Sequence, residues 1–96
     1  MSEDRTNPEN FKPGIYEHYK GSTYTALMLV RHHETEELCV LYLSHDSKHG
    51  TPRIREWATP GKDSWTDEVP YRDVYGLTTG EKVPRFKFIR PIHSAY

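Results

Sequence analysis

Two alternating segments separated by a short polar turn constrain the fold of this chain most strongly. In residues 23–31 and again in residues 38–43, apolar and aromatic side chains recur at every second position, which is the period of a β-strand. The turn at residues 33–36 is short, so the two segments must run antiparallel. A helix is disfavoured by the β-branched and aromatic residues and by the polar turn. We therefore expect a β-hairpin.

The first of these segments also predicts which side chains share a face. Successive residues of a strand point to opposite faces of a sheet. One face of residues 23–31 would carry Tyr24, Ala26, Met28 and Val30, and the other Leu27 and Leu29. Because both sets are apolar, we expect this segment to be the central strand, with its middle covered on both sides.

Further short strands follow from the same pattern. Residues 13–21 form a segment with glycines near both ends, which is typical of a short strand that presents polar and ring-bearing side chains at a bend. Residues 53–57 are long enough for one strand, and residues 71–75 are expected to pair with residues 81–89. Five aromatic residues that alternate with polar ones are expected to be core positions: Tyr16, Tyr24, Tyr42, Phe86 and Phe88.

These strands predict an all-β fold. Five or six short antiparallel strands within about 80 residues suggest a small barrel or roll of SH3-like type. A chain of 96 residues fits one domain. We expect a disordered polar tail at residues 1–10 and a single SH3-like β domain at residues 11–96, because the tail has no apolar anchor.

Composition narrows the compartment and the partners. Cys39 is the only cysteine and lies in an apolar run, so we expect a buried structural thiol, no disulfides and a reducing, cytoplasmic location. No stretch approaches the length of a membrane-spanning helix, so we expect a soluble protein without membrane contact. The net charge of -1 disfavours long nucleic acid as a partner. A small anion remains a fitting ligand, since a few basic groups in a pocket suffice.

Three short motifs then carry a resemblance. They read Pro13-Gly14-x-Tyr16-x-His18-Tyr19-Lys20-Gly21, His32-x-Glu34-Thr35 followed by Val40-x-Tyr42, and Pro84-Arg85-Phe86 with Ile89. In order and spacing, over residues 11–90, they resemble the bacterial and phage family catalogued as domain of unknown function 1653. The resemblance implies a small all-β protein of SH3-like barrel type and no assigned activity. In residues 51–57 the chain departs from the family pattern, and either Arg53 or Arg55 takes the place of a family arginine.

Seven residues in or near these motifs form a candidate ligand site, because they fall at the ends of different predicted strands. They are His18, Tyr19, Lys20, His32, Glu34, Trp57 and Arg85. Strand ends in a small barrel meet at one rim, so we expect these side chains to converge. In such a pocket Glu34 or His18 would recognise a polar edge of the ligand.

The other members of the set suggest what the ligand is. Arg85 and Lys20 would hold a phosphate or carboxylate, and Tyr19 or Trp57 would stack on a ring, which together describe a nucleotide-like anion. The competing interpretation is structural. In it Glu34 and Arg85 form an ion pair and Lys20 is a solvated turn residue. His18 then satisfies a backbone carbonyl.

Three functions fit this sequence. The first is a non-catalytic binding module whose rim pocket takes a small anionic, nucleotide-like ligand, as a phage protein that sequesters a nucleotide would. The second is a protein interaction module that contacts a host protein through the loop at residues 57–70. The third is an enzyme acting on a nucleotide or modified base, with His18 or Glu34 as general acid or base. We assign no catalytic residue, metal ligand or cofactor, since the sequence has no nucleophile elbow or phosphate cradle and His32 and His33 would point to opposite faces.

Overall fold

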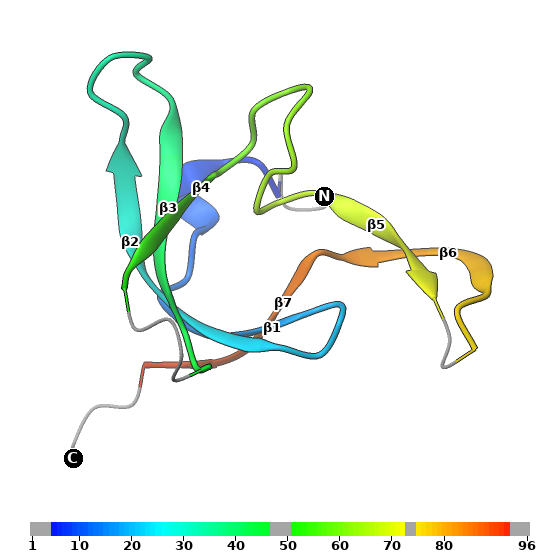
Figure 1. Ribbon diagram of the computed structural model, residues 1–96. Coiled ribbons are helices and arrows are strands. Elements are labelled where there is room, and N and C mark those ends of the chain that lie inside the picture. Colours follow the sequence, from blue (N-terminus) through cyan, green and yellow to red (C-terminus); the bar gives the residue numbers. More distant parts are fainter. Residues whose placement is uncertain (1–4, 47–50, 73–74, 93–96) are drawn as a thin grey trace.

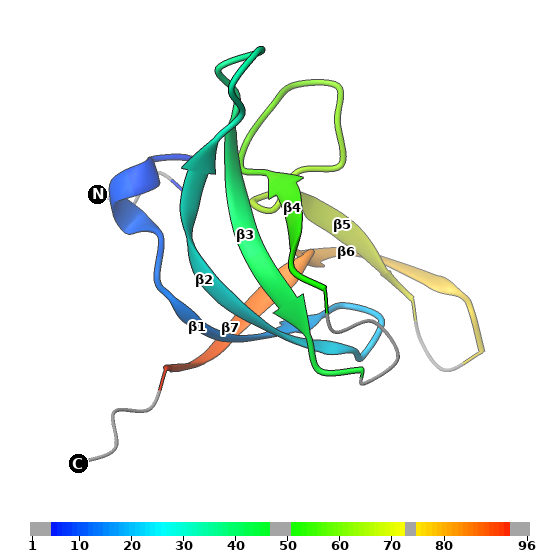
Figure 2. The same ribbon diagram turned by 60° about the vertical axis from the view of Figure 1, so that its left-hand side comes forward.

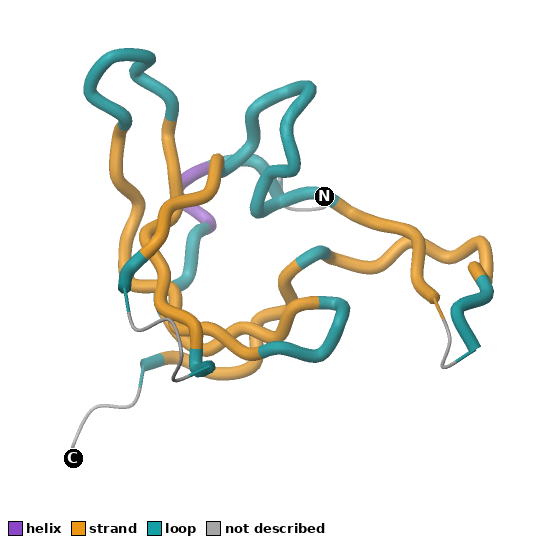
Figure 3. Tube along the Cα trace, viewed as in Figure 1, coloured by secondary structure: helices purple, strands orange, loops and turns teal. Residues whose placement is uncertain are grey.

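The computed structural model describes residues 5–46, 51–72 and 75–92 of the chain (Figure 1). Within them the chain forms a short 3-10 helix and seven strands. They are η1 (Pro8–Asn10), β1 (Gly14–His18), β2 (Thr23–Arg31), β3 (Leu38–Ser44), β4 (Arg53–Glu56), β5 (Glu68–Arg72), β6 (Thr78–Pro84) and β7 (Phe86–Pro91). The prediction of an all-β fold is confirmed, since the described residues contain no α-helix (Figure 3).

The strands form two antiparallel sheets. Five of them pair in the order β4-β3-β2-β1-β7, and β5 pairs with β6. The larger sheet is strongly curved, and the β5–β6 hairpin projects away from it (Figure 2). The predicted hairpin of residues 23–31 and 38–43 is therefore present as β2 and β3, and β2 is the central strand. This arrangement is consistent with an SH3-like barrel.

The core fills the concave side of the larger sheet. It consists of Tyr16, Ala26, Val40, Tyr42, Trp57, Trp65 and Phe86, with Tyr24 and Phe88 among the half-buried residues packed against it. The aromatic rings meet mostly edge to face, but Trp65 and Phe86 are stacked in parallel with ring centroids 3.8 Å apart. All five aromatic residues expected in the core are thus in it or against it. Large rings supply much of the buried area in a chain this short.

One expectation about β2 is wrong. The pairing of β2 with β3 shifts between Ala26 and Met28, so an extra residue, Leu27, bulges out of the ladder. A bulge reverses the alternation beyond it. Leu29 consequently packs against the core in place of Met28, which is 52% exposed. The middle of the central strand is therefore not covered on both sides.

The last predicted strand is also divided. Residues 81–89 were expected to be continuous, but β6 ends at Pro84 and pairs with β5, whereas β7 begins at Phe86 and pairs with β1. Arg85 lies at the corner, where its backbone N–H donates to the Asp67 carbonyl (2.8 Å) and its carbonyl accepts from the Tyr19 N–H (2.9 Å). β5 begins three residues earlier than expected, and residues 73–74 of the expected 71–75 strand lie outside the described residues.

The loop between β4 and β5 is fixed to the core. Trp57 and Trp65, at its two ends, are 6% and 3% exposed. Fully buried Ser64 donates to the Thr59 carbonyl (3.1 Å) and accepts from the Thr59 N–H (2.8 Å). Both tryptophans therefore attach the loop to the barrel.

The N-terminal segment lies against this loop. The Trp57 indole N–H donates to the Thr6 carbonyl (2.8 Å), Phe11 meets the Trp57 ring edge to face, and the Arg5 guanidinium lies 3.0 Å from the Glu68 carboxylate. Residues 5–10 thus contact the domain in this structure. The boundary at residue 10 and the mobility of residues 1–10 in solution stay predictions.

Candidate functional site

The structure separates the seven predicted site residues into groups. His18, Tyr19 and Lys20 lie at the turn between β1 and β2, whereas His32 and Glu34 lie in the turn between β2 and β3. These turns are at opposite ends of the nine-residue strand β2 (Figure 1). The expectation that all seven meet at one rim is therefore wrong, because consecutive turns of an antiparallel meander alternate between the two ends of the sheet.

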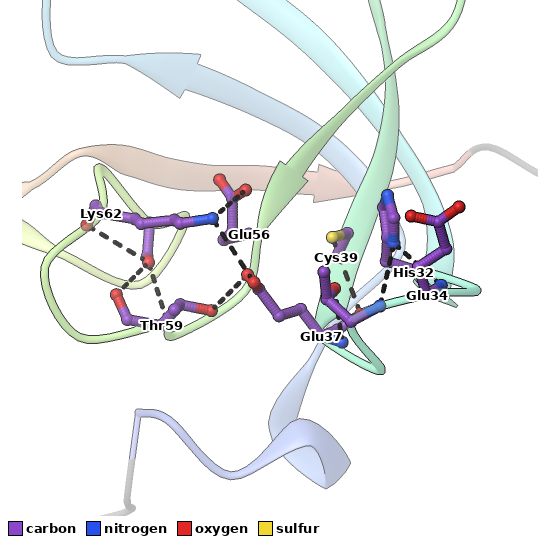
Figure 4. A network of polar contacts seen from close by, with 9 residues as sticks. His32, Glu34, Glu37, Cys39, Glu56, Thr59 and Lys62 are labelled. Atoms are coloured by element: carbon purple, nitrogen blue, oxygen red, sulfur yellow. Dashed lines mark hydrogen bonds and ion pairs between the residues drawn. The ribbon is translucent and has the colours of Figure 1, made fainter.

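His32 and Glu34 belong to a structural cluster. The His32 Nδ1 accepts from the backbone N–H groups of Glu34 (3.2 Å) and Thr35 (3.3 Å), so its ring holds the turn together. Next to this turn the Lys62 ammonium lies 3.4 Å from the Glu37 carboxylate and 3.7 Å from the Glu56 carboxylate (Figure 4). We call this group, with Thr59 and Cys39, the β2–β3 cluster. The thiol of Cys39 is buried, as predicted, and burial raises its pKa so that it stays protonated at neutral pH.

The structural interpretation expected an ion pair between Glu34 and Arg85, but Arg85 does not pair with Glu34. Its Nη2 lies 3.6 Å from the Asp63 Oδ1 and 3.8 Å from the Asp67 Oδ2, and its side chain is only 14% exposed. Its Nε is buried and has no hydrogen-bond partner among the described residues. The backbone bond from Tyr19 to Arg85 brings this arginine beside the β1–β2 turn, so the structure unites it with His18, Tyr19 and Lys20 but not with His32 or Glu34.

Strand β4 supplies a residue that sequence reasoning left undecided. In the register of β4 with β3, Arg55 lies opposite Val40 and Arg53 opposite Tyr42. Cross-strand partners share a face, and Val40 and Tyr42 are in the core. Both arginines therefore stand on the concave face, while Ile54 between them is 50% exposed on the convex face. In β4 the charged side chains face the core and the apolar side chain faces outward, which is the reverse of the usual pattern of a half-buried strand.

Arg55 lies over the aromatic core. Its guanidinium carbon is 5.4 Å from the centre of the Phe86 ring, a cation–π distance, and its Nη1 donates to the Asp63 carbonyl (2.8 Å). Like that of Arg85, its Nε is buried without a hydrogen-bond partner in the described part of the chain. Unsatisfied buried donors are rare in folded proteins and cost free energy. Two of them on neighbouring arginines mark this region as unusual.

His18 lies between these arginines and the rings. Its ring centroid is 5.0 Å from that of Phe86 and 6.3 Å from that of Tyr24. Burial lowers the pKa of His18, and repulsion by Arg55, Arg85 and Lys20 lowers it further. The imidazole is therefore neutral at pH 7. Since its Nδ1 accepts from the Lys20 N–H (3.2 Å), the proton is on Nε2, which can donate to a ligand.

Two hollows open on either side of Arg55. One, of about 230 Å³, is lined by Ser22, Tyr24, Tyr42, Ser44, Asp46, Arg53 and Arg55. The other, of about 460 Å³, shares Tyr42 and Arg55 and extends toward Lys62 and Asp63. We call the first the arginine hollow. It combines two guanidinium groups, two phenol rings and two hydroxyl side chains, which is a set suited to an anion that carries a ring.

The sequence held a signal for this site that was not used. Trp57 is a buried residue two positions after Arg55, so the odd-numbered residues of 53–57 face inward and Ile54 faces outward. The decisive contacts come from the tertiary fold, however. Asp63 and Phe86 reach Arg55 from a loop and from the last strand.

These features define a class of protein: a small all-β domain whose curved sheet gathers arginines and aromatic rings on its concave face. The family described as "Protein of unknown function (DUF1653)" matches residues 14–88, and the chain belongs to this family. The chain is similar to the crystal structure of a DUF1653 protein from Bordetella bronchiseptica, with 29% identity, a TM-score of 0.70, and coverage of 92% of this chain and 99% of that one. None of the curated proteins matches significantly. Across the described residues, no helix is long and apolar enough to cross a membrane, and no group of three or more His, Cys, Asp or Glu residues is placed to hold a metal ion.

Proposed function

We propose that this protein is a non-catalytic binding module that holds a small anionic, nucleotide-like ligand in the arginine hollow. The observation that carries the proposal is the inward orientation of Arg55 on β4, over Phe86, with a buried Nε–H that finds no acceptor among the described residues. A ligand anion would offer the acceptor that this region lacks.

The charges around the hollow favour an anion. Arg53 and Arg55 line it. Arg85 lowers the pKa of His18, as Arg55 also does. Arg85 is balanced by two aspartates, but both of its ion pairs are long, at 3.6 and 3.8 Å, and Asp63 is 85% exposed. A bound anion would relieve the mutual repulsion of Arg55, Arg85 and Lys20 around His18.

The rings favour a planar group next to that anion. Tyr24 and Tyr42 both line the hollow and meet edge to face at 5.4 Å. The volume of about 230 Å³ suits a base or a phosphate rather than a whole nucleotide, so the rest of the ligand would extend past Arg55 into the adjoining hollow. Asp46 also lines the hollow, so the lining carries one carboxylate beside its two arginines.

A thermal-shift measurement tests the proposal. Purified protein is screened with mononucleotides, dinucleotides and cyclic dinucleotides, and at least one should raise the melting temperature, because a ligand that binds only the folded state stabilises it. The effect should be lost in Arg55→Ala, reduced in Arg55→Lys, which keeps the charge but not the planar fork, and unchanged in Arg90→Ala, an exposed arginine on β7. No shift across the panel would contradict the proposal. Recovery of a converted ligand after denaturation would favour the enzyme instead.

A second candidate function is a protein interaction module. It is favoured by the projecting β5–β6 hairpin, on which Tyr71, Tyr75 and Leu77 are 40%, 84% and 65% exposed. The expected contact loop at residues 57–70 has its two tryptophans buried, so the hairpin is the better surface for a host protein. Co-purification of a partner that is lost in Tyr75→Ser but kept in Arg55→Ala would support this function.

A further inference from the structure

Another hollow lies between the N-terminal segment and the aromatic core. It has a volume of about 390 Å³ and is lined by Arg5, Asn10, Lys12, Tyr16, Trp57, Trp65, Thr66, Pro84, Phe86, Lys87 and Phe88. We call it the N-terminal hollow. The Phe86 ring is stacked on Trp65 in this hollow, and its centre lies 5.4 Å from the guanidinium carbon of Arg55. The ring therefore contacts residues of both the N-terminal hollow and the arginine hollow.

The lining of this hollow is basic. Among the described residues it includes Arg5, Lys12 and Lys87 and no carboxylate. Arg5 is engaged by the Glu68 carboxylate (3.0 Å) and the Thr66 carbonyl (3.1 Å). Lys87 lies opposite Glu17 in the β1–β7 register. Lys12 and Lys87 form no ion pair among the described residues, so both lysines leave positive charge at the hollow, which suits a small anionic ligand.

Trp65 supplies an unused hydrogen-bond donor. Its side chain is almost completely buried, at 3% exposure, and its indole Nε1 has no hydrogen-bond partner among the described residues. Trp57 provides the contrast within the same hollow, because its Nε1 donates to the Thr6 carbonyl. Buried indole N–H groups are normally paired. The N–H of Trp65 thus lacks an acceptor beside a basic, ring-lined hollow.

Lys12 is held in place at the hollow. The Tyr16 hydroxyl donates to the Lys12 carbonyl (2.6 Å), and burial raises the pKa of Tyr16 to about 12, so this donor persists at neutral pH. The Lys12 Nζ lies 5.4 Å from the centre of the Phe88 ring. The backbone bond orders the residue, and the ring positions its charge beside an aromatic surface.

From these contacts we infer that the N-terminal hollow is a second binding site, which takes a small planar aromatic carboxylate. The carboxylate meets Lys12 and accepts from the Trp65 N–H, and the ring of the ligand packs among the aromatic side chains of the lining. This site shares no lining residue with the arginine hollow or with the hollow that adjoins it, so the inference does not depend on the nucleotide-like site.

The two tryptophans of the chain provide the test. In ¹H–¹⁵N spectra of the full-length protein they give two indole signals, assigned with Trp65→Phe. Benzoate and indole-3-acetate, titrated to about 10 mM, should shift the Trp65 signal downfield in a saturable manner, as a new hydrogen bond does. Lys12→Ala should weaken the affinity by roughly tenfold or more, since it removes a charge-assisted contact. Benzamide, which has the ring without the charge, should bind at least that much more weakly.

Matched controls test whether the effect is specific to Lys12. Lys82→Ala removes an exposed lysine on β6 and Arg90→Ala an exposed arginine on β7, both outside the lining of the hollow; neither should change the titration. Absence of a saturable shift with both carboxylates overturns the inference, and so does an undiminished affinity in Lys12→Ala. Tighter binding of phenyl phosphate than of benzoate would overturn the choice of a carboxylate.

Discussion

The arginine hollow and the β2–β3 cluster are both gatherings of polar side chains, yet they are built differently. In the cluster, Lys62 stands between two carboxylates, and His32 accepts two backbone N–H groups. Around the hollow, burial together with Arg55 and Arg85 disfavours protonation of His18, and two buried N–H groups have no partner among the described residues. The comparison teaches that a ligand-binding site is better sought where charges are not fully compensated. A high local number of histidine and acidic residues is a weaker indication.

The largest expected effect is a loss of stability on removal of the Phe86 ring, which packs against Arg55 of the arginine hollow. Phe86→Ala should destabilise the fold by about 3–5 kcal/mol, because it empties a core position stacked on Trp65 and packed under Arg55. Urea unfolding monitored by tryptophan fluorescence measures this loss. A loss below about 1 kcal/mol would mean that the aromatic platform is not part of the core. Phe86→Leu, which retains an apolar side chain, should lose less.

The second prediction separates binding from stability. Arg55→Ala should weaken binding of the nucleotide-like ligand by about ten- to hundredfold, the cost of one charge-assisted contact, while the protein stays folded. Isothermal calorimetry gives the affinity and circular dichroism the fold. If the variant unfolds and the affinity per folded molecule is unchanged, Arg55 is structural and the contrast between the two regions disappears.

The third prediction addresses the compensated region. Lys62→Ala should lower the free energy of unfolding by about 0.2–1 kcal/mol, the usual range for a solvent-exposed ion pair, since Lys62 is 50% exposed. Ligand affinity should fall less than in Arg55→Ala, because Lys62 lines only the adjoining hollow. A loss of affinity in Lys62→Ala larger than in Arg55→Ala would reverse the assignment of the two regions.

The smallest expected effect is a change in pH dependence. The pKa of His18 is lowered in the folded state from its ordinary value of 6.5, so the unfolded chain binds the proton more readily. Stability is therefore full above pH 6.5 and falls as the pH drops from 6.5 toward the folded pKa. Melting curves from about pH 7.5 to 5.5 should show this decline, and His18→Gln should make it shallower. An identical slope in the variant would show that neither burial nor the nearby cations lower the pKa of His18 in the folded state.

The strands could be predicted where the pattern is local. Residues 23–31 and 38–43 alternate clearly, and β2 and β3 formed there. The bulge at Leu27 was not predictable, because it preserves composition and changes only the register. The break at Arg85 depends on a backbone bond to Asp67, eighteen positions away in the chain (85 − 67), which no local pattern reports.

The site was harder to predict than the strands. His18, Tyr19, Lys20 and Arg85 are neighbours, as their motifs suggested, because β1 pairs with β7. His32 and Glu34 were grouped with them only because strand ends were assumed to share a rim. Arg55 was left beside Arg53 as an undecided alternative, since both face inward and only the tertiary contacts of Arg55 with Asp63 and Phe86 distinguish it.

The position of β4 at the edge of its sheet gives its arginines a second consequence. An edge strand has one row of free backbone groups that can recruit a strand from another molecule and start a fibril. Inward-pointing charges on such a strand oppose this growth, because an added strand would have to desolvate them. Replacing Arg53 and Arg55 together by leucine would leave a short, apolar, open edge. Yield and turbidity on expression would then report on these residues before any ligand is added.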